Sequence, residues 1–96
     1  MNQLREKMIY LFARYQQTIK FVEESKFPQF EKCQKQHLIG LCETAIKRIE
    51  NKDMPYGKAC RWLGFIQGIL CSMGVLKVDG ERDLTRAIFA EEKSFE

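Results

Sequence analysis

The side chains in this 96-residue sequence that could carry out chemistry are few and widely spaced. The single histidine, His37, lies in a polar run, which favours a solvated or edge-packed imidazole over a catalytic one. Ser25, Ser72 and Ser94 have no base close to them in the sequence. No segment matches the glycine-rich phosphate loop G-x-x-x-x-G-K-[ST]. We therefore expect no enzyme activity and no cofactor.

The cysteines are possible metal ligands, because Cys33 and His37 are four residues apart and could share one face of a helix. A structural zinc site usually takes its four ligands from closely spaced pairs. Here the intervals between successive cysteines are nine, eighteen and eleven residues, so we predict no metal site. We expect the thiols to be reduced and to act as small core residues. They are Cys33, Cys42, Cys60 and Cys71.

The net charge of +3 is mild, but its distribution is uneven. Residues 55–78 contain three basic residues and no acid, whereas residues 79–96 contain six acids and three basic residues. A protein dedicated to nucleic-acid binding usually has a denser basic stripe. No export signal opens the sequence, and the longest uncharged stretch, 62–76, is too short to span a membrane. The cytoplasm is the expected compartment.

The hydrophobic periodicity predicts an all-α fold, a single domain over residues 1–96. In the first predicted helix, apolar residues recur at three- and four-residue steps and form one wide face. They are Leu4, Met8, Leu11, Tyr15, Ile19 and Val22. In the second helix, Phe30 and Cys33 extend the apolar face toward its start. The predicted helices are about 2–24, 29–51, 55–73 and a shorter fourth at 79–90.

Several turn residues fit these boundaries. Pro28 can open the second helix, and Asp53 is a suitable N-cap for the third. Gly74 fits the position just after a helix, where a left-handed conformation is common. Asp79 is a suitable N-cap for the fourth helix.

The segment 55–73 is apolar almost all round, and we expect the other helices to pack around it. One of its faces is a stripe of small residues, which predicts that another backbone crosses it at close range. On this interpretation Gly64→Leu or Gly68→Leu should unfold the protein. The stripe consists of Gly57, Cys60, Gly64, Gly68 and Cys71.

Binding to another protein is the function that the sequence favours, because aromatic and arginine side chains dominate interface hot spots. Tyr10 is the aromatic residue of the first helix least easily explained as core. A homodimer formed through helix 2–24 is a close competitor, because its apolar face is wide. The candidate partner contacts are Tyr10, Arg14, Tyr56, Arg61 and Arg82.

A small DNA-binding regulator is the alternative, with residues 74–88 acting as part of a helix-turn-helix. Lys77, Arg82 and Arg86 would then face phosphates or base edges. Glu81 and Asp83 would oppose that role, because they lie in the first turn of the would-be recognition helix.

The segment MPYGKACRWLGFIQGILCSMGVLKVDGERDLTR, residues 54–86, resembles a pattern in small accessory proteins from the early regions of tailed bacteriophages of enteric bacteria. The pattern reads GK-x-x-RWLGF-x-QG-x-L followed by D-x-ERD-x-TR, and it consists of packing residues rather than a catalytic motif. The resemblance implies an early protein that binds and modulates or inhibits a host complex. Such targets include the RecBCD recombination nuclease, as in anti-RecBCD proteins, and the CRISPR machinery. The pattern assigns no contact residues.

Overall fold

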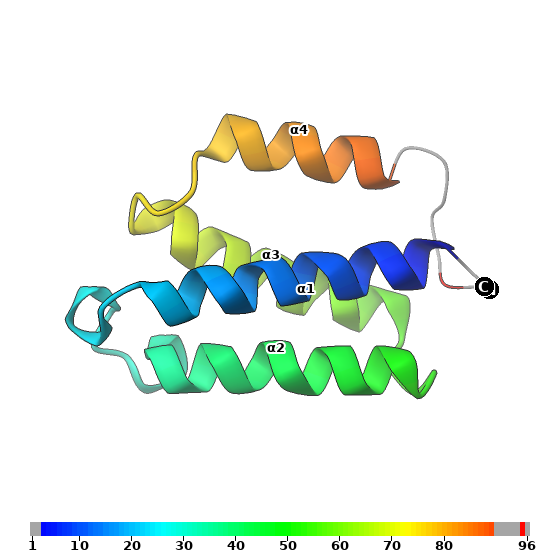
Figure 1. Ribbon diagram of the computed structural model, residues 1–96, viewed down its shortest axis with the longest axis horizontal. Helices are drawn as coiled ribbons and strands as arrows, with labels where there is room; N and C mark the ends of the chain where they lie inside the picture. The colour runs from blue at the N-terminus through cyan, green and yellow to red at the C-terminus, as the bar shows by residue number, and fades with distance from the viewer. Residues whose placement is uncertain (1–2, 90–94, 96) are drawn as a thin grey trace.

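The computed structural model describes residues 3–89 and residue 95 of the chain. Within these residues it contains four α-helices and no strand, which confirms the prediction of a small all-α bundle. Each helix runs back against the direction of the one before it (Figure 1). The helices are α1 (Gln3–Phe21), α2 (Lys35–Glu50), α3 (Tyr56–Ser72) and α4 (Val78–Phe89), with short 3₁₀ turns at Glu24–Lys26 and Glu31–Cys33.

Helix α1 is the element around which the others pack. It lies between α2 and α4 in Figure 1, with α3 behind it, and it contacts all three. The apolar stripe predicted from the sequence is fully buried from Leu4 to Ile19, with Phe12 added to it, whereas Val22 is half-buried and lies beyond the end of the helix, which stops at Phe21 instead of residue 24. The buried residues of α1 are Leu4, Met8, Leu11, Phe12, Tyr15 and Ile19. The width of this face is therefore explained by packing within one chain.

The prediction that helix 55–73 forms the centre of the bundle is wrong. One side of α3 is buried, through Ala59, Leu63, Ile66, Ile69 and Leu70. The opposite side is open: Gly64 and Gly68 are exposed, and a Cβ placed on either would meet no heavy atom within 4 Å. No other backbone of the described chain crosses α3 at these glycines. The expectation that a larger side chain at Gly64 or Gly68 unfolds the protein loses its basis.

The predicted second helix, 29–51, begins too early, because α2 starts at Lys35. Phe30 and Gln34 have extended backbones, and Phe30 is 76% exposed instead of extending the apolar face. The Lys35 ammonium, at the first residue of α2, ties this start to the end of α1, since it donates hydrogen bonds to the carbonyls of Lys20 and Val22 at 3.1 and 2.8 Å. A cation here satisfies carbonyl groups at the C-terminal end of α1.

The two sharp turns after α2 and α3 share one geometry. After α3, Gly74 has a φ of 77°, and the amide of Val75 donates to the carbonyl of Leu70. This is the helix end predicted for Gly74. After α2, Lys52 occupies the equivalent position with a φ of 60°. A residue with a Cβ is strained there, so the turn after α2 is less favourable than the turn after α3.

The two predicted aspartate caps are not formed. Asp53 accepts a hydrogen bond from Arg48 at 3.0 Å, and Pro55 occupies the N-cap of α3 without a side-chain cap. Asp79 lies within the first turn of α4, because the helix starts one residue earlier at Val78. An acid in a first turn still complements the helix dipole.

Candidate functional site

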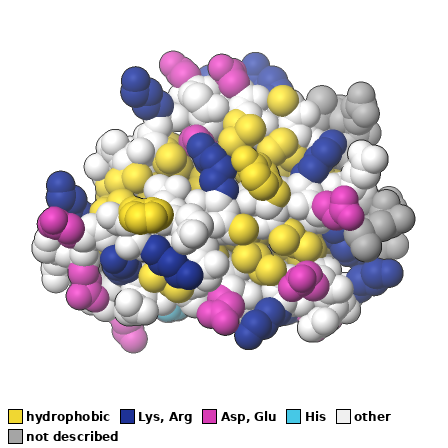
Figure 2. Space-filling model, viewed as in Figure 1, with side chains coloured by type: hydrophobic (Ala, Val, Ile, Leu, Met, Phe, Trp, Pro, Cys, Tyr) yellow, Lys and Arg dark blue, Asp and Glu magenta, His cyan; other side chains and the backbone are white. Residues whose placement is uncertain are grey.

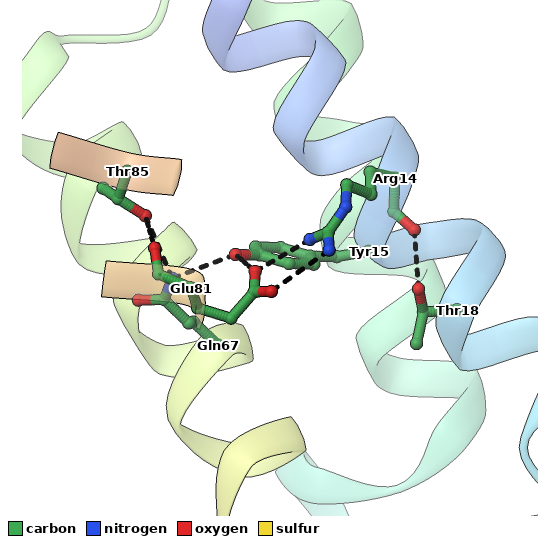
Figure 3. Close-up of polar contacts among 6 residues, drawn as sticks. All are labelled: Arg14, Tyr15, Thr18, Gln67, Glu81 and Thr85. Carbon is green, nitrogen blue, oxygen red and sulfur yellow. Dashed lines mark hydrogen bonds and ion pairs between the residues drawn. The ribbon is translucent and has the colours of Figure 1, made fainter. Parts of the chain in front are cut away.

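A buried carboxylate on α4 is the most unusual polar feature of the described structure. Glu81 is only 6% exposed, and it is the one buried residue of α4. Its two oxygens accept hydrogen bonds from the Arg14 guanidinium at 2.7 and 3.1 Å (Figure 3). The Tyr15 hydroxyl donates a third at 2.6 Å. A buried charge is tolerated when it is paired and hydrogen-bonded in this way.

Gln67 and Thr85 extend this arrangement so that it joins three helices (Figure 3). The Gln67 amide nitrogen donates to the Tyr15 hydroxyl at 2.9 Å and to the Thr85 hydroxyl at 3.2 Å. The Thr85 hydroxyl donates to the backbone carbonyl of Glu81 at 2.7 Å. We call Arg14, Tyr15, Gln67, Glu81 and Thr85 the Glu81 network. It ties α4 to α1 and α3 by polar contacts.

The network fixes the protonation states of its members. Burial alone would raise the pKa of Glu81, but the hydrogen bonds from Arg14 and Tyr15 outweigh it and lower the pKa below its usual value. Burial, together with the hydrogen bond to Glu81, raises the pKa of the Tyr15 phenol. The hydrogen bond to Glu81 raises the pKa of Arg14. At neutral pH the network therefore holds a carboxylate, a guanidinium and a neutral phenol.

A cavity of about 550 Å³ lies next to this network, between α3 and α4. We call it the α3–α4 groove. Its α3 side is formed by Gly64, Gln67, Gly68 and Cys71. Its α4 side is formed by Val78, Glu81, Arg82, Thr85, Arg86 and Phe89. The groove is large enough for several side chains of a bound molecule.

The rim of the α3–α4 groove is positively charged. Arg82 and Arg86 are exposed, and no hydrogen bond or ion pair joins either to another described side chain. Arg61 is exposed one helical turn before Gly64 and also has no ion-pair partner among the described residues. Glu81 does not offset these charges, because Arg14 already pairs with it. The groove is thus suited to an anionic partner.

The five candidate contacts do not converge on one place. Arg82 lines the groove, and Arg61 lies on the same face of α3 just beyond it. Arg14 does not line the groove, and its guanidinium is engaged by Glu81. Tyr56 is half-buried, and its ring meets those of Phe89 and Phe95 at 6.5 and 5.2 Å between centroids. These four residues remain predicted partner contacts, and they differ in how much of each side chain is exposed to solvent.

Tyr10 does not line the groove, and its side chain is 56% exposed on α1. Figure 2 shows apolar side chains gathered over the middle of the face in view, with Lys and Arg side chains beside them. Phe21 at the end of α1 is 87% exposed. The predicted role of Tyr10 would therefore need a second contact area on the molecule, separate from the α3–α4 groove.

Sequence reasoning missed the groove because its floor was interpreted as a packing face. The sequence pattern indicates Arg86 only as a DNA contact, to phosphates or base edges, although it stands four residues after Arg82 and shares its side of α4. The partner of Glu81 had no sequence signal, since Arg14 is 67 residues away. Gln67 was assigned no role, yet a glutamine between two glycines of an apolar helix is a polar group that needs partners.

The four cysteines are free thiols, but only Cys42 is a buried core residue; Cys33, Cys60 and Cys71 are half-buried, so the expectation that all four act as small core residues holds for Cys42 alone. Burial raises the pKa of Cys42 to about 12. Burial and the charge of Glu81 raise the pKa of Cys71, which faces the groove. Within the described residues, no group of three or more His, Cys, Asp or Glu side chains could hold a metal ion. Among those same residues, no helix has the length and hydropathy to cross a membrane.

Comparison of the chain with protein-family models, with curated proteins and with solved structures found no match. The resemblance to phage accessory proteins therefore rests on the sequence pattern of residues 54–86 alone.

Proposed function

We propose that this protein is a non-catalytic binding protein that modulates or inhibits a host protein complex. The observation that carries the proposal is the α3–α4 groove, with an exposed glycine floor and a rim of arginines. The resemblance of residues 54–86 suggests a phage origin, a cytoplasmic setting, and a host nuclease or CRISPR complex as the target.

The physical argument starts from the cost of the exposed glycines and the availability of the arginine side chains beside them. A glycine inside a helix costs about 0.5–1 kcal/mol relative to alanine. Gly64 and Gly68 are exposed, and nothing in the described chain packs close to them. Arg82 and Arg86 keep their donors available at the same place. A partner seated in the groove would use both features.

The test is affinity capture from an enteric bacterial lysate with a groove-filling variant, Gly68→Phe. Gly40→Phe is the matched control, because Gly40 is also an exposed helical glycine with open space beyond its Cα. We expect the wild-type protein and Gly40→Phe to recover the same stoichiometric partner, and Gly68→Phe to lose it. Failure to recover any stoichiometric partner, or equal recovery by both variants, would contradict the proposal.

DNA binding through residues 74–88 is the second candidate, and one observation favours it. Glu81 is turned inward onto Arg14, so one of the two acids that opposed this role is removed from the surface. Lys77, Arg82 and Arg86 remain exposed, as does Asp83. Binding of random duplex that weakens steeply between low and physiological salt would support it. Absence of a shift at low salt would remove it.

A further inference from the structure

We propose that the occupant of the α3–α4 groove is an amphipathic helix of the partner protein, with acidic side chains that meet Arg82 and Arg86. This inference rests on the function proposed above and specifies the chemistry of the partner. It follows from the shape of the groove floor, from the lack of a strand edge in the described part of the chain, and from the charge of the groove rim.

The shape of the floor favours a helix. Gly64 and Gly68 are four residues apart, so they lie one above the other and expose the α3 backbone along one line. Side chains at such spacing form the rows into which the ridge of a second helix packs. Glycines in these rows let the two backbones approach closely. The close crossing expected at these glycines would thus be supplied by another molecule.

The dimensions of the groove also fit. The α4 wall is a helix of 12 residues, which corresponds to about 18 Å at 1.5 Å per residue. About three turns of a partner helix would lie along it, with apolar anchors at three- and four-residue steps. Val78 and Phe89 provide apolar contacts near the two ends of this wall. An extended peptide has no such template, because the described part of the chain contains no strand edge.

The charge of the rim selects an acidic partner over a second copy of this chain. Residues 55–78, which include the whole groove face of α3, contain no acid. A second copy docking through this face would bring arginines against arginines, and like charges at an interface cost several kcal/mol. Asp79 and Asp83 lie on α4 outside the groove lining. Glutamates or aspartates on a foreign helix would instead pair with Arg82 and Arg86.

The experiment begins with a photo-crosslinking amino acid at Val78, which is exposed and lines the groove. The control carries the same group at Glu43, an exposed position on α2. We expect Val78, but not Glu43, to crosslink to the captured partner. The crosslinked segment should be helical and acidic. Crosslinks only to nucleic acid, to this chain itself, or to a segment without excess acid would overturn the inference.

A charge exchange then tests the contact itself, with a synthetic peptide of the crosslinked segment as the probe. Arg86→Glu should weaken peptide binding about tenfold or more, and a peptide with its facing glutamate changed to arginine should restore the affinity. Unchanged melting of Arg86→Glu would show that folding is intact. Lack of restoration would overturn the inference. If a partner is captured and Gly68→Phe loses it, but the crosslinked segment is not a helical acidic one, only this inference fails; if no partner is captured, or if Gly68→Phe still recovers it, the proposed function fails too.

Discussion

At the scale of single residues, the Glu81 network is what most distinguishes this bundle from a purely apolar one. Its donors and acceptors are matched, with three hydrogen bonds on the carboxylate and one accepted by Tyr15 from Gln67. A network satisfied in this way specifies one packing of its helices, whereas loss of a member leaves buried polar groups without partners. The consequences can be measured residue by residue.

Tyr15→Phe should lower the free energy of unfolding by about 1–2 kcal/mol, because it keeps the buried ring but removes the hydroxyl that binds Glu81 and Gln67. Urea denaturation followed by circular dichroism measures the change. Tyr10→Phe is the matched control, since the Tyr10 side chain is 56% exposed and should change stability little. Equal effects of the two substitutions would show that the network does not stabilise the fold.

The pH dependence of stability should carry the signature of Glu81. Its pKa in the folded protein lies below its ordinary value of 4.5, so its ionised form stabilises the fold at neutral pH. This contribution is present above about pH 4.5 and is lost as the pH falls through the folded pKa. We expect the wild-type protein to exceed Glu81→Gln in stability at pH 7 and the difference to shrink toward pH 3. A difference independent of pH would contradict this assignment.

At the scale of elements, the helices differ from one another at their ends and on their open faces. The turns after α2 and α3 share a backbone conformation, but one uses Lys52 and the other Gly74. Similarly, α3 has one buried side and one side with exposed glycines. Both contrasts lead to substitutions that should stabilise the protein.

Lys52→Gly should raise the free energy of unfolding by about 0.5–1 kcal/mol, because glycine adopts a φ of 60° without strain. Lys52 is exposed, so the substitution removes no packing. The converse substitution, Gly74→Ala, should lower stability by about 1 kcal/mol at a φ of 77°. Thermal melting of both variants gives the comparison. If Lys52→Gly were less stable than the wild-type protein, the lysine side chain would contribute more stability than its strained backbone conformation costs.

Gly68→Ala should raise the free energy of unfolding by about 0.5–1 kcal/mol, through helix propensity alone. The added methyl group meets no heavy atom within 4 Å, so it creates no clash. Leu70→Ala, at a fully buried position two residues away, should instead cost about 2–5 kcal/mol. Chemical denaturation separates these outcomes. If Gly68→Ala unfolded the protein, another backbone would have to cross α3 closely at Gly68, contrary to the structure.

At the scale of the whole molecule, the four helices are held unequally. The apolar core is built from α1, α2 and α3, each with several buried residues, whereas Glu81 is the one buried residue of α4. Leu84, Ile88 and Phe89 of α4 are only partly buried against that core. Helix α4 is thus attached by these partly buried side chains and by the Glu81 network, and it also forms one wall of the α3–α4 groove.

Hydrogen exchange should therefore show α4 opening more readily than α1. Regions with few buried apolar contacts open at a lower free energy than the global transition. Mass spectrometry of deuterated peptides should report lower protection for residues 78–89 than for residues 3–21. Glu81→Gln should reduce the protection of α4 more than that of α2, which contains no network member. Uniform loss of protection across all helices would indicate that α4 is part of one cooperative core.

The sequence by itself determined the helices and some of their ends. Local periodicity predicted the buried stripe of α1, since residues three and four apart share a helix face. Gly74 predicted the end of α3, because the left-handed conformation there is a local requirement. The predicted start of α2 was wrong: Phe30 and Gln34 have extended backbones, and Lys35 at the true start binds the carbonyls of Lys20 and Val22, contacts between distant residues that local pattern cannot detect.

Only the tertiary structure decided which helix is central, what the glycines face, and where Arg14 and Glu81 meet. A helix face of apolar or small side chains is suited to close contact, but the sequence does not say which element makes that contact. The stripe at Gly64 and Gly68 fits a neighbouring helix in the same chain and an open groove equally well. Arg14 and Glu81 are 67 residues apart, and only the packing of α4 on α1 joins them. The α3–α4 groove is a product of that packing.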